Sequence, residues 1–491
     1  MSRDDAASDD PAKAPRAAWR FDVAVLAAIA LVVRIPAYLA SAHLDFDDAV
    51  YGASAIAMRR GGLPFRDVFS SQGPLHLPIV FVGDILGGRS GSSPRLAATL
   101  AGFVAAAAVY AAARRLTTRP GAITAGIVVA VSGSVLWTTG PITADGPAIA
   151  LGATAVALAL RYRDTPRAMS ALATGAILGA ALSVKAPLVL ATTIPVAGFL
   201  LADRRARDAV VAAAGASAVG LAATLPWGFG RVWDQSVAYQ IDSDRNASMR
   251  ANAQKIISTL WERDPFLLAL AAVAVAPVVA TAIRRRPAPH GGRERSGRRP
   301  AHQRFDAYLV AAWLGALVLF LVIEPAMWRN HIAHLVVPAA LLLALRPPSA
   351  RLVAIAALVA LPFQAAHLGA LLSPDPYTGD EATAVEALRS LPVHALAISD
   401  DPGFVWRSGR ATPFDLVDTS LKRIQQGRIT TTSVADAAGD PHVCAVLVWS
   451  GRHFGSLNGL ADALEREGYS EALRFGDDRV LYERADCVPP R

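Results

Sequence analysis

Charged residues are scarce in this sequence of 491 residues. Asp, Glu, Lys and Arg make up 18% of the chain, whereas a soluble protein of similar length usually contains about 25%. They are nearly absent from many separate runs of about 20 residues, which is the length that a helix needs to cross a bilayer. Alanine-rich helices buried in a soluble protein are the alternative, but the number of separate runs favours membrane spans. We therefore expect an integral membrane protein.

Cysteine is also scarce, because only Cys444 and Cys487 occur and both lie outside the apolar runs. No metal-ligand spacing surrounds them, so the sequence predicts no metal site. If this part of the chain lies in an oxidising compartment, the two thiols can form a disulfide; two unpaired thiols are the alternative. The sequence leaves open whether a divalent cation takes part in the function.

The long apolar runs predict a polytopic α-helical membrane protein. The first run resembles a signal peptide in its position, but no small-residue cleavage site follows it and many further runs do. Residues 75–87 are apolar but too short to cross comfortably, and Asp84 interrupts them, which favours a re-entrant or interfacial helix. About eleven transmembrane helices are expected, near 21–41, 94–113, 120–139, 143–160, 168–184, 186–202, 208–227, 264–283, 306–323, 331–345 and 350–371.

The net charge of +8 comes with arginines in short loops between the apolar runs. Nucleic-acid binding is another explanation for a basic chain, but this distribution is typical of orientation signals, so we expect no nucleic-acid partner. If 75–87 does not cross, the positive-inside rule places the N-terminal segment 1–20, expected to be disordered, in the cytoplasm with the basic loop 284–304. That loop has eight Arg and one Glu, and attraction to anionic lipids is a second role for it. The other arginines assigned to the cytoplasm are Arg114, Arg115, Arg119, Arg161, Arg163, Arg167, Arg204, Arg205, Arg207, Arg346 and Arg351.

The same orientation places the C-terminal segment, 373–491, outside the cytoplasm. Its composition is that of a soluble domain, in contrast to the membrane domain expected over 21–372. Helices are expected at 381–390 and 457–467, and alternating or continuous apolar patterns predict strands at 393–399, 443–449 and 479–484. We therefore predict a small extracytoplasmic α/β domain that follows a multi-pass domain in the plasma membrane. Asp400, Asp401, Trp406 and Arg407 could bind sugar there, although a strand-end turn with a packed Trp is favoured.

Acidic residues on the predicted outer face are candidates for catalysis. Asp47 and Asp48 follow the first span, in an outer loop expected over 42–93, and Tyr51 shares a helical face with Asp48. A carboxylate that is partly desolvated at the membrane edge can act as a general base. Asp145 falls at the outer end of the third span. Helix N-capping is the alternative role for each of these acids.

Several cationic residues fall on the same predicted face. Lys185 lies between two apolar runs, and Arg34 lies in the outer half of the first span. A cation at such a depth is costly unless it reaches the interface or meets an anion. Arg329 and His331 precede another span, and with His334 the histidines are too few to predict a metal site. Acids and cations gathered at one face suit a lipid-linked phosphate substrate, with the cations on the phosphate and an acid activating a hydroxyl.

These residues fall in motifs that resemble the polyprenyl-phosphate-dependent glycosyltransferases of the GT-C fold, in particular the family 39 group. That group includes protein O-mannosyltransferases and bacterial aminoarabinose transferases. The second position of the acidic pair departs from the family, being Asp48 instead of Glu, and the C-terminal domain is expected to differ from those of the named relatives. The matching segments are Asp47-Asp48-Ala49-Val50-Tyr51, Gly62-Leu63-Pro64-Phe65-Arg66-Asp67, Gln72-Gly73-Pro74-Leu75, Gly140 to Pro147, the Gly-rich run ending at Lys185, and Trp328-Arg329-Asn330-His331 with Pro338.

The resemblance implies an enzyme that transfers a sugar from a polyprenyl-phosphate donor to an extracytoplasmic glycan, lipid or protein, with inversion at the anomeric carbon. Asp47 would be the general base, and Lys185, with Arg34, would stabilise the leaving phosphate. Asp145 would position the acceptor or a cation. A transporter or flippase is the first alternative class, but its ionisable residues usually lie near the bilayer midplane within repeated halves. A non-catalytic membrane sensor is the second, and it has no need of Asp47, Asp145 and Lys185 together.

Overall fold

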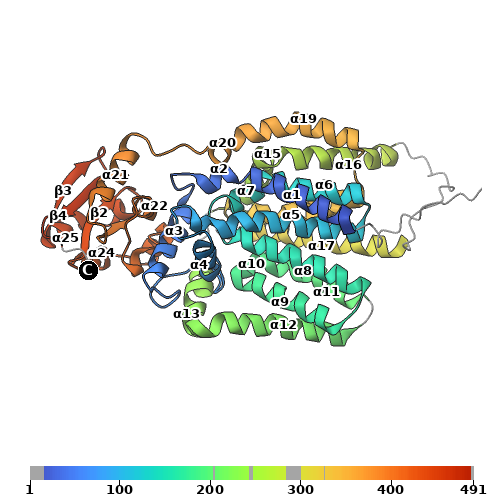
Figure 1. The fold of residues 1–491 in the computed structure, drawn as a ribbon, viewed down its shortest axis with the longest axis horizontal. Helices are drawn as coiled ribbons and strands as arrows, with labels where there is room; N and C mark the ends of the chain where they lie inside the picture. Colours follow the sequence, from blue (N-terminus) through green and yellow to red (C-terminus); the bar gives the residue numbers. More distant parts are fainter. Residues whose placement is uncertain (1–15, 203–204, 243–246, 284–299, 326, 488–491) are drawn as a thin grey trace, which may run out of the picture.

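A bundle of helices forms most of the molecule, and a small domain with a β-sheet lies at one end of it (Figure 1). The computed structural model describes residues 16–202, 205–242, 247–283, 300–325 and 327–487. Most of the predicted N-terminal segment and of the basic loop, residues 1–15 and 284–299, lies outside the described residues. The ends of both segments that are described, 16–20 and 300–304, belong to helices.

The helical part follows the apolar runs of the sequence. Each predicted span coincides with one helix or with two helices separated by a short break. The helices are α1 (Arg16–Val32), α2 (Ile35–Leu39), α3 (Phe46–Arg59), α4 (His76–Leu86), α5 (Leu96–Leu116), α6 (Arg119–Val131), α7 (Gly133–Thr139), α8 (Asp145–Asp164), α9 (Ala168–Val184), α10 (Ala186–Val189), α11 (Thr193–Leu201), α12 (Ala206–Thr224), α13 (Phe229–Trp233), α14 (Tyr239–Ile241), α15 (Met249–Arg263), α16 (Pro265–Ile283), α17 (Pro300–Ile323), α18 (Val336–Leu345), α19 (Ala350–His367) and α20 (Gly369–Leu372).

Several of these helices are broken or short. Within the described ranges, four helices are long and apolar enough to cross a bilayer, and the bent pair α6 and α7 makes a fifth. Other predicted spans contain shorter apolar helices, so the number of eleven stays a prediction. The predicted span 21–41 is interrupted after α1, where α2 begins with Pro36 in its first turn. A proline there lacks the N–H that a continuous helix would use.

The segment 75–87 forms the short helix α4, as predicted. Eleven residues extend about 16 Å at 1.5 Å per residue, which is half the thickness of the hydrocarbon core. Asp84, the acid that interrupts the apolar pattern, is buried and accepts hydrogen bonds from Arg59 Nε at 2.8 Å and from the Ser93 hydroxyl. The acid therefore fixes α4 to α3 and to the start of α5.

Polar pairs join the helix ends on each side of the bundle. At one end, Arg115 pairs with Asp164, Arg119 with Asp22, and Arg163 with Asp306. These residues belong to the ends that the charge pattern assigns to the cytoplasm. At the other end, Asp48 pairs with Arg95, and Asp145 with Lys185. The ion pairs thus form two groups, one near each end of α8.

The C-terminal domain is built around a four-stranded sheet in the order β1-β2-β4-β3. β1 is parallel to β2, whereas β4 is antiparallel to both β2 and β3. The expected strands at 393–399, 443–449 and 479–484 correspond to β1, β2 and β4, and the expected helices to α21 and α25; β3 was not expected. The elements are α21 (Gly379–Ser390), β1 (Leu396–Ser399), α22 (Pro402–Arg407), α23 (Leu421–Gln425), α24 (Thr431–Ala438), β2 (Val443–Val448), α25 (Leu460–Arg466), β3 (Tyr469–Arg474) and β4 (Val480–Arg484).

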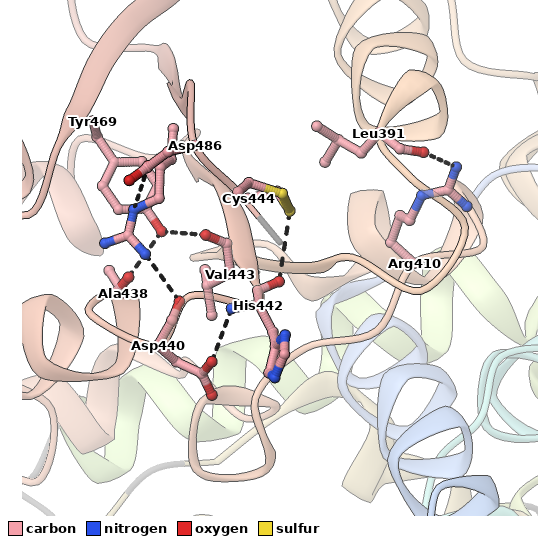
Figure 2. The surroundings of a disulfide bond; sticks show 11 residues. Leu391, Arg410, Ala438, Asp440, His442, Val443, Cys444, Tyr469 and Asp486 are labelled. Carbon is pink, nitrogen blue, oxygen red and sulfur yellow. Dashed lines mark hydrogen bonds and ion pairs between the residues drawn. A yellow bond between two sulfur atoms is a disulfide. The ribbon is translucent and has the colours of Figure 1, made fainter. Parts of the chain in front are cut away.

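A disulfide joins Cys444 and Cys487, which confirms one of the two alternatives left open by the sequence (Figure 2). Cys444 is buried in β2, and Cys487 follows β4. Beside it, the Tyr469 hydroxyl donates to the carbonyl oxygens of Ala438 and Val443, at 3.0 and 2.7 Å. The bond therefore ties the end of the described chain to a central strand of the sheet.

Removal of this disulfide should destabilise the C-terminal domain. The bond closes a loop with a sequence separation of 43, and the chain-entropy relation gives about 4 kcal/mol for a loop of that length. We expect the Cys444→Ser/Cys487→Ser variant to unfold in this domain at a lower temperature than the unaltered protein, measured by calorimetry in detergent. An unchanged transition would contradict a stabilising role, and a reducing agent should shift only the protein that retains both cysteines.

Candidate functional site

Asp145 is the centre of a buried polar cluster at the end of the bundle nearest the C-terminal domain. Its Oδ2 accepts a hydrogen bond from Lys185 Nζ at 2.8 Å, and its Oδ1 lies 3.1 Å from Nε2 of His334. The side chain of Asp145 is 3% exposed, that of Lys185 11% and that of His334 5%. One carboxylate thus holds a cation from the end of α9 and an imidazole from the segment Arg329–Leu335 that precedes α18.

Local sequence signals place these three side chains. Asp145 is the first residue of α8, where a negative charge interacts favourably with the helix dipole. Lys185 is the extended residue that ends α9, and Pro187 in the first turn of α10 prevents a continuous helix. Gly146 approaches the chain so closely that a Cβ atom there would lie 2.2 Å from the Thr138 carbonyl oxygen. The break at Lys185 and the tight turn before α8 therefore bring the two charges together.

Asp47 lies near this cluster and is partly exposed on α3. Within the described part of the chain, its carboxylate has no hydrogen bond or ion pair. Burial raises the pKa of Asp47 to about 6, although the positive charge of Lys185 opposes the rise. Asp145 and Asp418 add negative charge around it and raise the pKa further. A carboxylate in these surroundings has free oxygen atoms and the basicity of a general base.

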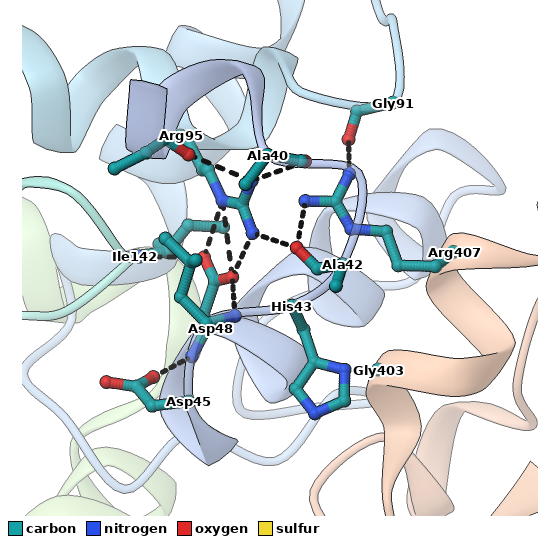
Figure 3. A network of polar contacts seen from close by, with 12 residues as sticks. Ala40, Ala42, His43, Asp45, Asp48, Gly91, Arg95, Ile142, Gly403 and Arg407 are labelled. Atoms are coloured by element: carbon teal, nitrogen blue, oxygen red, sulfur yellow. Dashed lines mark hydrogen bonds and ion pairs between the residues drawn. The ribbon is translucent and has the colours of Figure 1, made fainter. Parts of the chain in front are cut away.

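Asp48, the adjacent acid, is fully engaged in the fold (Figure 3). Arg95 Nε donates to its two oxygen atoms at 3.0 and 3.2 Å, and the backbone N–H groups of Leu44 and Ile142 donate to it at 2.9 and 3.0 Å. Burial alone raises the pKa of Asp48, but the Arg95 guanidinium brings it below its ordinary value. The pair predicted from the sequence is thus divided, because Asp48 joins the segments that contain Leu44, Arg95 and Ile142, whereas Asp47 has no such contacts among the described residues.

The remaining predicted residues differ in their relation to the cluster. Tyr51 is buried near Asp47, and His331 lies 3.0 Å from Glu324 through Nδ1. Arg34 does not join the cluster: its Nε donates to the Thr139 hydroxyl at 2.7 Å and its Nη1 to the carbonyl oxygens of Ala30 and Ala130. Its role is to satisfy backbone groups inside the bundle.

Arg329 is also engaged elsewhere. It forms an ion pair with Glu262 at the end of α15, where Nη1 and Oε2 are 2.9 Å apart, and its side chain is 43% exposed. The pair joins the segment before α18 to α15, a helix for which the sequence analysis had no prediction. Arg329 is therefore only two residues from His331 in the sequence but takes part in a separate contact.

Three residues around the cluster were not selected as site residues from the sequence. His334 was noted only because it and His331 are too few to predict a metal site, and nothing in the sequence marked Arg95 as the partner of Asp48. Asp418 comes from the C-terminal domain, where the preceding residue, Val417, packs in one apolar cluster with Tyr51. Asp418 is 5% exposed. Asp418 is far from Asp47 in the sequence, so the sequence did not indicate that the two charges interact.

The side chains around Asp145 do not suit a metal ion. Among the described residues, no three or more His, Cys, Asp or Glu side chains are grouped so as to hold one. The nearby Lys185 already balances the charge of Asp145. We therefore derive no step through a divalent cation.

Variants of the Arg95–Asp48 pair test whether Asp48 has a structural role that Asp47 does not share. Arg95→Met should lower the free energy of unfolding by about 3–5 kcal/mol, because it leaves the Asp48 carboxylate buried without its partner. The double variant Asp48→Asn/Arg95→Met should recover part of that loss. Thermal unfolding in detergent measures both effects, with the exposed Arg66→Met as the control; equal stability of the Arg95 and Arg66 variants would refute the assignment.

Comparison with known proteins identifies the fold. The dolichyl-phosphate-mannose-protein mannosyltransferase family model matches residues 72–229, a segment that includes Asp145 and Lys185. No curated protein matches the sequence significantly. Among solved structures, ArnT from Cupriavidus metallidurans, bound to undecaprenyl phosphate, has a TM-score of 0.64 at 16% identity; the alignment covers 97% of this chain and 100% of that one.

Two further structures share the arrangement over most of this chain. The Archaeoglobus fulgidus oligosaccharyltransferase has a TM-score of 0.53 at 14% identity, with 87% of this chain and 69% of that chain covered. The arabinofuranosyltransferase AftD from Mycobacteria has a TM-score of 0.50 at 16% identity, with 98% and 41% covered. The protein therefore shares the fold of these three structures, and residues 72–229 match the dolichyl-phosphate-mannose-protein mannosyltransferase family model.

Proposed function

We propose that this protein is an integral membrane glycosyltransferase that takes a sugar from a polyprenyl-phosphate donor. The GT-C fold and the family match over residues 72–229 support this class of enzyme. The observation that carries the proposal is the position of Asp47, a carboxylate without a partner among the described residues, next to the buried Lys185–Asp145 pair. A base and a phosphate-binding cation in one cluster are what such a transfer needs.

Lys185 is proposed to bind the phosphate that leaves in the reaction. Its ammonium group lies in low-dielectric surroundings, where a fixed charge stabilises developing negative charge more strongly than it does in water. Asp145 holds this ammonium in place with a hydrogen bond of 2.8 Å. His334, on the second oxygen of Asp145, fixes the orientation of that carboxylate. We assign Asp145 and His334 to positioning, and Lys185 to the substrate.

An apolar groove beside Lys185 supports a lipid-linked donor. It has a volume of about 630 Å³ and opens along α9 and α12, next to the turn that ends at Lys185. Its lining combines small side chains from α9 and α12 with larger apolar ones, which suits an apolar chain. A polyprenyl tail in this groove would leave its phosphate at Lys185. The lining residues are Pro74, Gly179, Leu182, Ser183, Ala216, Ser217, Gly220, Leu221, Thr224, Leu225 and Phe229.

Asp47 is proposed as the general base of a single displacement. The acceptor hydroxyl gives its proton to Asp47, its oxygen forms the new bond to the anomeric carbon, and the bond from that carbon to the phosphate oxygen breaks. One displacement inverts the anomeric centre. The lipid phosphate leaves with the bonding electrons, and Lys185 stabilises its charge.

The reaction is proposed to occur outside the cytoplasm. α16 ends and α17 begins at the end of the bundle opposite the C-terminal domain (Figure 1), and Asp306 near the start of α17 pairs there with Arg163 near the end of α8. The positive-inside rule assigns that end to the cytoplasm. The C-terminal domain and the Asp47 cluster then lie outside, and the acceptor is an envelope glycan, lipid or protein.

Sugar transfer in lipid vesicles tests the function and the base together. The unaltered protein should move radiolabelled sugar from a polyprenyl-phosphate donor, and Asp47→Asn should reduce the rate by about 10²–10⁴, the usual contribution of a general base. Asp415→Asn, a change of an exposed carboxylate in the C-terminal domain, is the matched control and should retain activity. Full transfer by a folded Asp47→Asn protein would disprove the base, and no transfer from any such donor would disprove the function.

The pH dependence of the same reaction should follow the ionisation of the Asp47 carboxyl group. A base accepts a proton only when it is ionised, and the pKa of Asp47 is about 6. We expect kcat/KM to rise about tenfold per pH unit below pH 6 and to level off above pH 7. The residual kcat/KM of the Asp47→Asn variant should not show this rise with pH. A wild-type profile that is flat between pH 5 and pH 7 would contradict the assignment.

A further inference from the structure

His76, the first residue of α4, is buried beside the proposed donor site but has no polar partner. It is 0% exposed, and neither ring nitrogen has a hydrogen bond within the described residues. Its ring packs edge-on against Tyr51, with centroids 4.3 Å apart. Such a contact satisfies the apolar part of an imidazole but leaves its N–H donor and its nitrogen acceptor without partners. Buried polar groups nearly always find partners, so this side chain needs a specific reason.

The backbone holds His76 close to Lys185. Gly73 N–H donates to the Val184 carbonyl oxygen at 3.0 Å, and Leu75 N–H donates to that of Ser183 at 2.9 Å. A Cβ atom at Gly73 would lie 2.3 Å from the Ser183 oxygen, so only glycine permits this approach. The start of α4 is therefore fastened to the residues that immediately precede Lys185. His76 and Lys185 extend from two segments that lie side by side.

The imidazole is neutral in these surroundings. Burial, with the positive charge of Lys185, lowers the pKa of His76 to about 3. A neutral imidazole offers one donor and one acceptor. A ligand that satisfies both must present an acceptor and a donor a few ångströms apart. A sugar phosphate does so, because its phosphate oxygens accept hydrogen bonds and its hydroxyl groups donate them.

We infer that His76 binds the sugar-phosphate head group of the donor, as a second contact beside Lys185. The inference rests on the proposed function and deepens it. The N–H group of His76 donates to a phosphate oxygen, and the other nitrogen accepts from a sugar hydroxyl. Lys185 attracts the phosphate by its charge, whereas the two hydrogen bonds of His76 orient the head group. The bond to a sugar hydroxyl lets His76 distinguish a glycosylated lipid phosphate from other anionic lipids.

Binding of undecaprenyl phosphate to the full-length protein in nanodiscs tests this inference. His76→Phe keeps a ring against Tyr51 but removes both nitrogens. We expect its affinity for undecaprenyl phosphate to fall on the order of tenfold, the effect of one lost hydrogen bond to a charged group. The KM for the sugar donor should rise by at least as much, with the KM for the acceptor unchanged. His76→Gln restores a donor and an acceptor and should recover part of the loss.

Stability separates a binding role from a packing role. Since the ligand-free protein gains nothing from the two nitrogens, His76→Phe should melt at the same temperature or higher, and the stabilisation by undecaprenyl phosphate should shrink. A lower melting temperature with unchanged affinity would mean that His76 only packs, and would overturn the inference. His394→Phe, at an exposed site in the C-terminal domain, is the control. If the unaltered protein neither binds undecaprenyl phosphate nor transfers sugar, the proposed function itself fails.

Discussion

The ion pair between Asp145 and Lys185 is the interaction on which the site depends. A buried charge is costly unless a partner compensates it, and here one carboxylate contacts both a lysine and a histidine. The three residues come from the start of α8, the end of α9 and the segment before α18. The pair thus joins helices that are far apart in sequence, and it keeps a cation near Asp47. The same ion pair therefore stabilises the packing of these helices and fixes the position of the Lys185 ammonium group.

Much of the bundle could be predicted because a bilayer demands long apolar segments. The positions of the helices follow from runs of about 20 residues, and the short length of α4 followed from its interruption by Asp84. The breaks were harder to predict. The bend between α6 and α7 depends on Ser132, whose hydroxyl donates to the buried Asp264 at 2.6 Å. Asp264 is 132 residues from Ser132 in the sequence, so no local sequence pattern predicts this contact.

The site was predicted in part. Local motifs grouped Asp47, Asp145 and Lys185, and the family resemblance implied Asp47 as the base, but no local pattern explained why Asp47 and not Asp48 is free. That answer depends on Arg95, which takes up Asp48 from the start of another helix. Asp418 and His76 were missed for related reasons. The first comes from a separate domain, and the second is notable only because its nitrogens have no partners among the described residues. Such properties arise from three-dimensional packing.

The contact between α3 and α22 has a mechanical consequence. Gly52 of α3 lies so close to Trp406 of α22 that a Cβ atom would be 2.4 Å from the indole. Arg407, stacked on Trp406, donates to the carbonyl oxygens of Gly91, between α4 and α5, and of Ala42, between α2 and α3. The C-terminal domain is therefore seated directly on the helix that bears Asp47. Any displacement of this domain would therefore act directly on α3, through the packed Trp406 side chain.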